Sequence, residues 1–441
     1  MKNMFRGILI LNLGGVSAQD YSKIVRKYNV FSHVVFVDGV SAEKVKELNP
    51  EGIVLCGKTS AEETLNIDKQ IFELGIPVLT IEDGTSVVAS LFGEAAKAQV
   101  ATEEENIESQ LTNFMFDICN CKKDWTAENF IDKSTEETKA QVGDGSVLLG
   151  LSGGVDSTVT AALLYKAIGS RLHCVFVDHG FMRKGEPELV KKIFTEYFPV
   201  SLTCVDARQR FMDKLKDVND PEKKRKIIGA EFIEVFKEEA KKLGKLDHFA
   251  QGTIYPDIIE SGTAGAGKLV KSHHNVGGLP KELGFTSLVE PLKYLFKPEV
   301  RKIGSALGLP DEFVLRQPFP GPGLSVRCLG ILTPERVDLV RESDAILREE
   351  IAKAGLQQFA DQYFTVLPGI RSVGVKDGER VFYEAIAIRA VKTTDFMTAD
   401  WVYYPKELLN TISNRILNEV PGINRVLLDI SPKPPASIEW E

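Results

Sequence analysis

Two stretches of the chain alternate short apolar runs with segments of helical periodicity, and this alternation constrains the fold more than any other feature. The apolar runs of the first stretch are Gly7–Leu13, Val34–Val37, Gly52–Cys56 and Pro77–Ile81. Those of the second stretch are Ser146–Leu151, Leu172–Asp178, Ser201–Val205 and His248–Thr253. Because short apolar runs separated by helices are typical of buried parallel strands, we predict an α/β chain with two parallel sheets.

The helices expected between these runs are Ala42–Leu48, Asn66–Leu74, Thr158–Ile168, Glu186–Tyr197 and Glu222–Leu243. Right-handed crossovers through such helices would wind the second series of strands into one sheet. Beyond residue 324 the pattern changes to mixed helices and strands, which predicts a small α+β domain. Its expected elements are the helices Pro334–Ala354 and Pro405–Val420 and the strands Ile370–Val375, Tyr383–Val391 and Arg425–Ile430.

Two stretches rich in polar, glycine or proline residues predict the domain boundaries. Residues 134–145 are polar and end in turn residues, which places the first boundary near residue 135. The proline- and glycine-rich run Gln317–Gly323 can continue neither a helix nor a central strand, so it marks the second boundary. We therefore predict three domains, at 1–135, 136–320 and 321–441.

The charge is concentrated in the first third of the chain. The formal net charge is -8, of which residues 1–135 contribute -7, so the remainder is nearly balanced. A balanced body argues against binding to long nucleic acids but not against binding a nucleotide. No apolar run reaches the roughly 18 residues of a membrane helix. The six cysteines form no Cys-x-x-Cys pair, which favours reduced thiols in a cytoplasmic protein.

The strand Ser146–Leu151 runs directly into a glycine-rich loop that opens a helix. Such a loop brings backbone N–H groups, hydroxyls and a helix N-terminus to an anion. Asp156 would repel a bare phosphate, and it makes sense if Mg²⁺ lies between its carboxylate and phosphate oxygens. The alternative is an ordinary strand-to-helix turn in which Asp156 is a helix-start charge. The candidate phosphate-binding residues are Ser152, Gly153, Gly154, Val155, Asp156, Ser157 and Thr158.

A second glycine-rich segment, Gly262–Lys268, fits the pattern G-x-x-x-x-G-K of a nucleoside triphosphate loop. Leu269 stands where that motif needs a serine or threonine to hold Mg²⁺. The segment also does not follow a buried strand. We interpret it as a glycine loop without a phosphate-binding role.

The loop Ser152–Ser157 resembles the pyrophosphatase loop of the N-type ATP pyrophosphatases, which cleave ATP between the α and β phosphates. Further segments resemble the GMP synthetase family in particular. They are Val177–Arg183, Gln251–Ser261, Lys271–Pro280, Gln317–Arg327, Arg389–Val391, Asp395–Trp401 and Asp429–Glu441. The resemblance extends from about residue 146 to the last residue.

This resemblance implies a reaction in which xanthosine monophosphate (XMP) attacks ATP, pyrophosphate leaves, and ammonia then displaces AMP to give GMP. It implies an ATP pyrophosphatase domain followed by a C-terminal domain that forms a homodimer. On the same basis Asp156 holds Mg²⁺ and Val177 and Asp257 contact ATP. The catalytic residues would be Asp156, Lys271, His273 and His274, and the XMP-binding residues Arg327, Lys433 and Glu441.

For some of these positions the residues alone favour a plainer interpretation. His273 and His274 would be exposed loop histidines, and Lys433, between two prolines, would belong to a rigid, solvated tail. Lys271–Pro280 as a whole could instead close over the α-phosphate and exclude water from a hydrolysable intermediate.

The first third resembles the class I glutamine amidotransferase domain of the family, which has a flavodoxin-like fold. The resemblance rests on Ile8–Leu13, Leu48–Val54 and Phe72–Leu79. In the family the last of these leads into a Gly-Ile-Cys-x-Gly nucleophile elbow, whereas here Thr80–Gly84 follows, with Glu82 at the nucleophile position. A carboxylate cannot replace a thiolate in forming a thioester with glutamine.

The other parts of a glutaminase site are also altered. The oxyanion-side segment is changed to Cys56–Thr59, and the family's His-Pro-Glu segment, which would bring the base, is absent. Only His33 precedes residue 173, and Cys56 is better interpreted as a core residue than as a substitute nucleophile. We predict a shortened, degenerate amidotransferase domain, with free ammonia or a separate glutaminase chain as the nitrogen source.

Three alternatives remain open at this point. The first is another enzyme with the same loop, such as NAD synthetase, argininosuccinate synthetase or a tRNA-thiolating enzyme. The second is a paralogue that aminates a related purine nucleotide. The third, from a different class, is a catalytically inactive nucleotide sensor.

Overall fold

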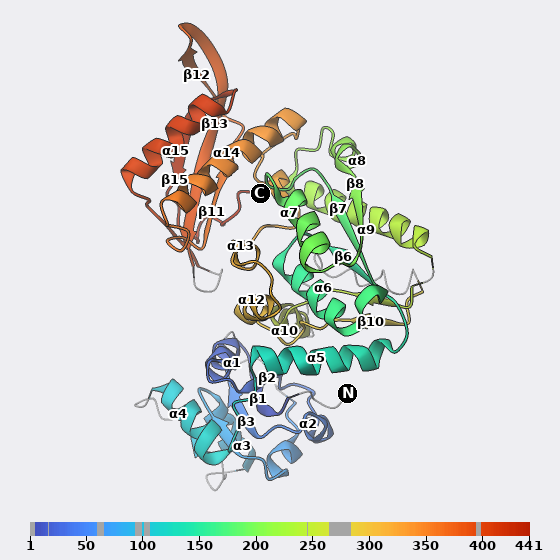
Figure 1. The fold of residues 1–441 in the computed structure, drawn as a ribbon. Helices are drawn as coiled ribbons and strands as arrows, with labels where there is room; N and C mark the ends of the chain where they lie inside the picture. Colours follow the sequence, from blue (N-terminus) through green and yellow to red (C-terminus); the bar gives the residue numbers. More distant parts are fainter. Residues whose placement is uncertain are drawn as a thin grey trace. The chain divides into compact units, whose positions relative to one another are not determined.

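The computed structural model describes residues 5–15, 17–59, 66–92, 99–100, 106–244, 246–263, 284–393 and 398–441 (Figure 1). The chain divides into two units that are discontinuous in sequence. Unit 1 contains Met1–Gly143, Gly252–Asn275 and Glu290–Leu307, and unit 2 contains Asp144–Gln251, Val276–Val289 and Gly308–Glu441. The three-domain division at residues 135 and 320 stays a prediction.

Unit 1 is built on a five-stranded parallel sheet of order β2-β1-β3-β4-β5. Its strands are β1 (Gly7–Asn12), β2 (Phe31–Phe36), β3 (Gly52–Cys56), β4 (Val78–Thr80) and β5 (Gln99–Val100). Every residue of β1 and β3 is buried, as expected for central strands covered on both faces. The first predicted parallel sheet is therefore confirmed.

The helices of unit 1 come from the first third of the chain and from two later segments. The first third gives α1 (Ser17–Lys27), α2 (Ala42–Leu48), η1 (Lys69–Glu73), α3 (Gly84–Phe92), α4 (Ile107–Asn113), η2 (Phe114–Ile118) and α5 (Ala127–Val142). The later segments give α10 (Tyr255–Thr263) and α12 (Lys297–Ala306).

Two predicted elements of this region differ in the structure. The helix expected at 66–74 is only a short 3₁₀ segment, η1, which starts where the Asp68 carboxylate accepts a hydrogen bond from Gln70 N at 3.0 Å. The polar stretch expected to break the chain near residue 135 is instead part of α5, which ends before Gly143. Small hydroxyl residues such as Ser134 and Thr138 are buried along that helix, so polarity alone was a poor indicator of a linker.

Unit 2 contains the second predicted parallel sheet, in the order β10-β9-β6-β7-β8. Its strands are β6 (Val147–Leu151), β7 (Leu172–Asp178), β8 (Ser201–Asp206), β9 (His248–Ala250) and β10 (Ser287–Val289). Its helical segments are α6 (Val155–Ile168), η3 (Gly169–Arg171), α7 (Glu186–Lys192), η4 (Ile193–Tyr197), α8 (Arg208–Lys214) and α9 (Pro221–Lys242). The central strand is β6, which pairs with β7 on one side and β9 on the other.

The C-terminal part of unit 2 is α+β, as predicted. A central strand, β13, pairs with β11, β12 and β14 antiparallel and with β15 parallel. The strands are β11 (Gln362–Val366), β12 (Arg371–Lys376), β13 (Glu379–Lys392), β14 (Asp400–Trp401) and β15 (Ile423–Asp429). The helical segments are α13 (Asp311–Val314), η6 (Gly323–Val326), α14 (Pro334–Lys353) and α15 (Lys406–Glu419).

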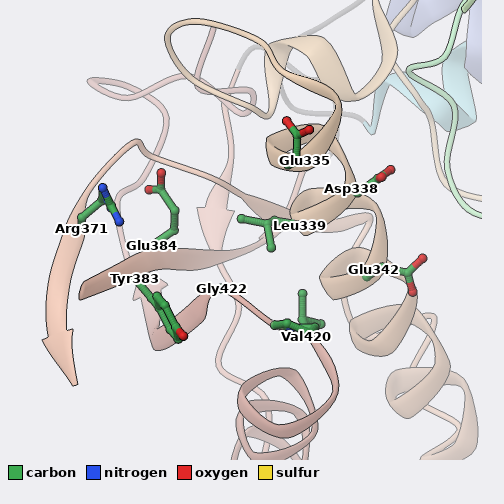
Figure 2. Close-up of a pocket in the computed structure, with 10 residues that line it drawn as sticks. Glu335, Asp338, Leu339, Glu342, Arg371, Tyr383, Glu384, Val420 and Gly422 are labelled. Carbon is green, nitrogen blue, oxygen red and sulfur yellow. The ribbon is translucent and has the colours of Figure 1, made fainter. Parts of the chain in front are cut away.

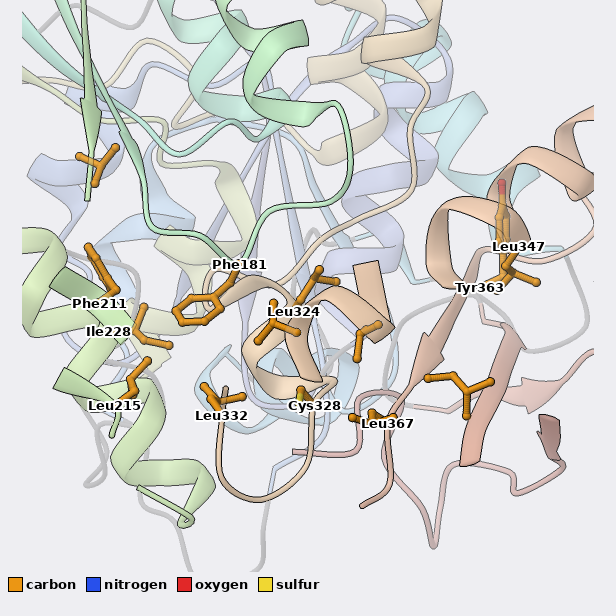
Figure 3. Packing of buried hydrophobic residues seen from close by; sticks show 14 of the residues in the cluster. Phe181, Phe211, Leu215, Ile228, Leu324, Cys328, Leu332, Leu347, Tyr363 and Leu367 are labelled. Carbon is orange, nitrogen blue, oxygen red and sulfur yellow. The ribbon is translucent and has the colours of Figure 1, made fainter. Parts of the chain in front are cut away.

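The two parts of unit 2 share one hydrophobic core. Phe211 and Ile228 from the helices of the parallel-sheet part belong to the same buried cluster as Leu324 and Leu347 (Figure 3). This continuity fixes the phosphate-loop region and the C-terminal sheet in one unit. Among the described residues, no helix is long and apolar enough to cross a membrane.

Candidate functional site

The glycine-rich loop lies between the end of the central strand β6 and the start of α6. Gly153 has φ +75°, in the left-handed region, and a Cβ there would lie 2.7 Å from Met182 Cε. The Gly154 N–H donates to Ser152 Oγ at 3.3 Å, and Ser157 Oγ donates to the Gly154 carbonyl at 3.1 Å. The two serine hydroxyls are 3.2 Å apart, so the loop gathers hydroxyl groups at the start of a helix.

The loop leaves the N-terminus of α6 suited to an anion. Gly154 is the N-cap and supplies no side-chain cap, and α6 is 14 residues long. Ser152 is exposed and Asp156 is half-buried, whereas Val155 and Thr158 are buried. Of the seven predicted residues, Val155 and Thr158 therefore contribute to packing rather than to an open surface.

The residues of the loop fit a magnesium ion carried in with a nucleotide. Among the residues that the structure describes, no group of three or more His, Cys, Asp or Glu side chains could hold a metal ion by itself. Mg²⁺ at phosphate-transfer sites is commonly held by one or two carboxylates together with the phosphate oxygens of the substrate. Asp156, in the first turn of α6, could be such a carboxylate.

Arg316 adds a positive charge near the loop that the sequence did not single out. Its Nη1 lies 3.3 Å from Glu186 Oε1, and its guanidinium lies 4.1 Å from the centroid of the Phe313 ring. Burial lowers the pKa of Arg316, while Glu186 and Asp156 act in the opposite direction. The sequence could have indicated Arg316 as a candidate site residue, because it directly precedes the Gln317–Gly323 run, which resembles the GMP synthetase family.

The turn after β7 is ordered by its own polar groups. Val177, predicted to face adenine, is buried in the core of unit 2, so its backbone rather than its side chain would be the available contact. Phe181 N donates to His179 Nδ1 at 3.0 Å, and burial lowers the pKa of His179 to about 4. Arg183 is buried beside Glu186 and donates to the Pro318 carbonyl at 3.1 Å.

The predicted XMP-binding residue Arg327 is fully buried. Its Nη2 lies 2.7 Å from Glu439 Oε1, and its guanidinium lies 3.8 Å from the centroid of the Phe364 ring. Its Nη1 is buried with no hydrogen-bond partner among the described residues. A buried donor without a partner is costly, so this nitrogen is a suitable contact for an oxygen of a ligand.

The other two predicted XMP-binding residues lie in the terminal segment. Lys433 forms a backbone bridge with Ala399, with N···O distances of 2.7 and 3.0 Å, so this part of the tail is tied to the fold. Glu441 Oε2 accepts a hydrogen bond from Lys224 Nζ at 2.5 Å, and the Glu441 main-chain oxygen accepts one from Arg225. No sequence pattern indicated Lys224 or Arg225, which lie on α9.

The predictions for the remaining site residues stay untested. Lys271, His273 and His274 lie outside the described residues, as does most of the Gly262–Lys268 segment. Asp257 belongs to unit 1, where its Oδ2 accepts a hydrogen bond from Ile254 N at 3.1 Å at the start of α10.

The predicted nucleophile-elbow position in unit 1 has a strained backbone. Glu82 has φ +57°, which is uncommon outside glycine, asparagine and aspartate. Its Oε2 accepts hydrogen bonds from Gly57 N at 2.8 Å and from Ser17 Oγ at 2.9 Å. The carboxylate therefore occupies a backbone donor on the segment that corresponds to the oxyanion side.

Cys56 is fully buried, and burial together with the nearby Glu82 carboxylate raises its pKa to about 12. This confirms its assignment as a core residue.

A cavity of about 460 Å³ lies elsewhere, against α14, β13 and the connection between α15 and β15 (Figure 2). It is lined by several acidic side chains, Arg371 and Tyr383. None of its lining residues was predicted as a site residue. All of them lie between Glu335 and Gly422, far along the sequence from the phosphate loop at Ser152–Thr158.

Comparisons with known proteins found matches to the C-terminal part of the chain, to the region around the glycine-rich loop, and to the chain as a whole. Residues 349–440 match the family described as GMP synthase C terminal domain, and residues 126–207 match the NAD synthase family. The chain is 45% identical to the "GMP synthase [glutamine-hydrolyzing]" of Bacillus cytotoxicus, over 515 positions that cover 100% of both chains. It is 44% identical to the protein of that name from Bacillus anthracis, again over 100% of both chains. Because this chain has 441 residues, those relatives contain residues with no counterpart here.

Among solved structures, an NH3-dependent NAD synthetase from Campylobacter jejuni is similar over 43% of this chain and 77% of that chain. The identity is 15% and the TM-score is 0.33, a likeness too weak to carry an argument.

Proposed function

The chain belongs to the GMP synthase family, and we propose that it catalyses the ATP-dependent amination of XMP to GMP in the cytoplasm. The observation that carries the proposal is the loop Ser152–Ser157, at the carboxyl end of the central strand β6 and at the N-terminus of α6. The C2 oxygen of XMP would attack the α-phosphorus of ATP, and pyrophosphate would leave. Ammonia would then attack C2, and AMP would leave with that oxygen.

The described side chains suit the handling of two anionic substrates. The loop N–H groups and the hydroxyls of Ser152 and Ser157 would orient the pyrophosphate portion of ATP. Asp156 would hold Mg²⁺, which when bound neutralises charge on the departing pyrophosphate. Arg316 would add a fixed positive charge on that side, and the orphaned Nη1 of Arg327 would contact an oxygen of XMP.

We further propose that ammonia, and not glutamine, is the direct nitrogen donor. The support is the elbow, where a carboxylate stands at the nucleophile position and accepts hydrogen bonds from Gly57 N and Ser17 Oγ. A carboxylate held in this way would repel the oxyanion that glutamine hydrolysis develops. The curated relatives carry "glutamine-hydrolyzing" in their names, so this chain would have lost an activity that its relatives are named for.

The test is steady-state GMP formation by the purified protein with XMP, Mg-ATP and either ammonium chloride or glutamine. We expect turnover with ammonium and none with glutamine, while a separate glutaminase chain added to the assay should restore the response to glutamine. Glutamine-supported turnover by the pure protein, unaffected by Glu82→Gln, would refute the ammonia proposal. AMP release with XMP compared against its purine analogues separates this function from that of a paralogue or an inactive sensor.

We also propose that residues 321–441 form a homodimer. The support is a set of exposed apolar side chains on β12 and β13, among them Val375 at 77% and Phe382 at 53% exposure. Val373 and Val375 project on the same face of β12, and Phe382 pairs with Val373. Val375→Glu should convert a dimer to a monomer in light scattering, whereas Lys376→Glu, at an exposed polar position, should not.

A further inference from the structure

Unit 1 contains an arginine whose guanidinium is enclosed by aromatic rings. Arg26, on α1, has a side chain only 3% exposed. Four ring centroids lie within 5.2 Å of its Cζ: Trp125 at 4.6 Å, Tyr255 at 5.0 Å, Phe31 at 5.1 Å and Phe296 at 5.2 Å. Two of these rings come from the first third of the chain and two from segments beyond residue 252. The cation–π contacts therefore join regions far apart in the sequence.

The charge of Arg26 is neutralised by a residue of α12. Arg26 Nη1 lies 2.9 Å from Glu299 Oε2 and donates to the Tyr294 carbonyl at 2.6 Å. The Glu299 carboxylate also accepts hydrogen bonds from Trp125 Nε1 at 2.5 Å and from Phe296 N at 2.7 Å. A buried ion pair of this kind is stable only when its remaining donors and acceptors are satisfied, and most of those of Glu299 are.

Tyr255, the first residue of α10, is fully buried in the same core. Its hydroxyl accepts a hydrogen bond from Val34 N of β2, and its own N–H donates to the Leu295 carbonyl at 2.9 Å. Tyr255 and Ile259 share a hydrophobic cluster with Ile8, Ile10 and other strand residues of the first third. The segment Gln251–Ser261, which carries part of the resemblance to the synthetase, is therefore packed into the amidotransferase-like sheet from Tyr255 onward.

From these contacts we infer that the first third of the chain, proposed above to lack glutaminase chemistry, is an obligatory scaffold for the later segments α10 and α12. It holds α10 and α12 in place through Arg26, Glu299 and Tyr255. Arg26 is thereby a positioning residue for α10, which carries Asp257, a predicted ATP contact. This explains why a domain that has lost its nucleophile would be retained: α10 and α12 would lose their buried partners without it.

The test is hydrogen exchange of the full-length protein, followed by mass spectrometry, in the variant Arg26→Met. Because removing one partner leaves a buried carboxylate uncompensated, peptides covering α10 and α12 should exchange about 100-fold faster. Peptides covering β6 and β7 should be unchanged. Lys23→Met is the matched control, since Lys23 lies on the same helix, is 48% exposed and pairs with the exposed Asp20, and it should leave exchange unaltered.

A second readout rests on the proposed function. In Arg26→Met the KM for ATP in ammonia-dependent GMP formation should rise about fivefold or more, while the KM for XMP stays unchanged. General loss of folded protein would lower the rate without splitting the two constants. Arg26→Lys should restore part of the ATP response, because it keeps the charge but not the fork of donors.

Each exchange or turnover result either supports or overturns the scaffold role or the proposed function. Faster exchange confined to α1 and β2, with α10 and α12 protected as in wild type, would overturn the inference. Should Arg26→Met not fold, Tyr255→Phe removes only the hydroxyl that accepts from Val34 N, and it should speed α10 exchange about fivefold. Absence of turnover in the wild type would refute the proposed function and leave the exchange result decisive for the scaffold role.

Discussion

The elbow around Glu82 and the loop around Asp156 are built alike and differ in what their side chains offer. Both follow a strand of a parallel sheet, both contain a residue with positive φ, and both lead into a helix. At the elbow the carboxylate folds back onto Gly57 N and Ser17. At the loop the hydroxyls of Ser152 and Ser157 meet beside a helix N-terminus. The comparison teaches that two similar strand-to-helix turns can offer a ligand different groups, a carboxylate at one turn and hydroxyl and backbone N–H groups at the other.

The largest effect should come from the loop. Asp156→Asn removes the carboxylate proposed to hold Mg²⁺ and should lower kcat for ammonia-dependent GMP formation about 100- to 1,000-fold. Glu196→Gln, at an exposed position of the same unit, serves as the control and should leave kcat unchanged. A kcat within twofold of wild type for Asp156→Asn would contradict the proposal that the loop around Asp156 is catalytic and that it differs in this from the turn around Glu82.

An intermediate effect is expected from acid on the unit that carries the loop. His179 is buried with its pKa lowered to about 4, so between pH 6.5 and 4 the unfolded chain binds a proton that the folded chain excludes. Stability should therefore fall as the pH falls through that window, by up to about 1.4 kcal/mol per pH unit from this residue. His179→Asn can keep an acceptor for Phe181 N without titrating.

Urea unfolding of wild type and His179→Asn at pH 7, 6 and 5 measures this contribution. The variant should lose less stability on acidification than the wild type does. Equal slopes for the two proteins would show that His179 does not stay neutral in the folded state.

The smallest effect should come from the elbow. Glu82→Cys restores the expected nucleophile but not a base, so we expect no glutaminase activity by glutamate release. The loss of the hydrogen bonds to Gly57 N and Ser17 should lower the unfolding free energy of unit 1 by about 1–2 kcal/mol. Glu82→Gln, which keeps one acceptor, should lose less. Measurable glutaminase activity in Glu82→Cys would show that the elbow is only one substitution from function.

Local pattern predicted many elements of the fold closely. The ranges of β3, β7 and α2 agree residue for residue with the expected segments, because unbroken apolar runs and helical periodicity leave little choice. The 3₁₀ segment Lys69–Glu73 and the length of α5 were not predicted, because tertiary burial decides how far a weakly periodic segment stays helical.

The candidate site could be predicted only where its residues are neighbours in sequence. The loop from Ser152 to Ser157 is such a case. Lys224 lies 217 residues from Glu441, and Arg26 lies 273 residues from Glu299, so no local pattern could pair them. The carboxylate at position 82 was identified from the resemblance, but the donors that hold it became visible only in the structure.

The shared core of unit 2 also limits how this protein can change over evolutionary time. Phe211 and Leu324 belong to one hydrophobic cluster, although the sequence predicts a domain boundary between them near residue 320. A gene fusion that exchanged the C-terminal segment alone would bring a foreign surface against Phe181, Ile228 and their neighbours. The two halves of that core are therefore expected to be inherited together and to accept substitutions in a correlated manner.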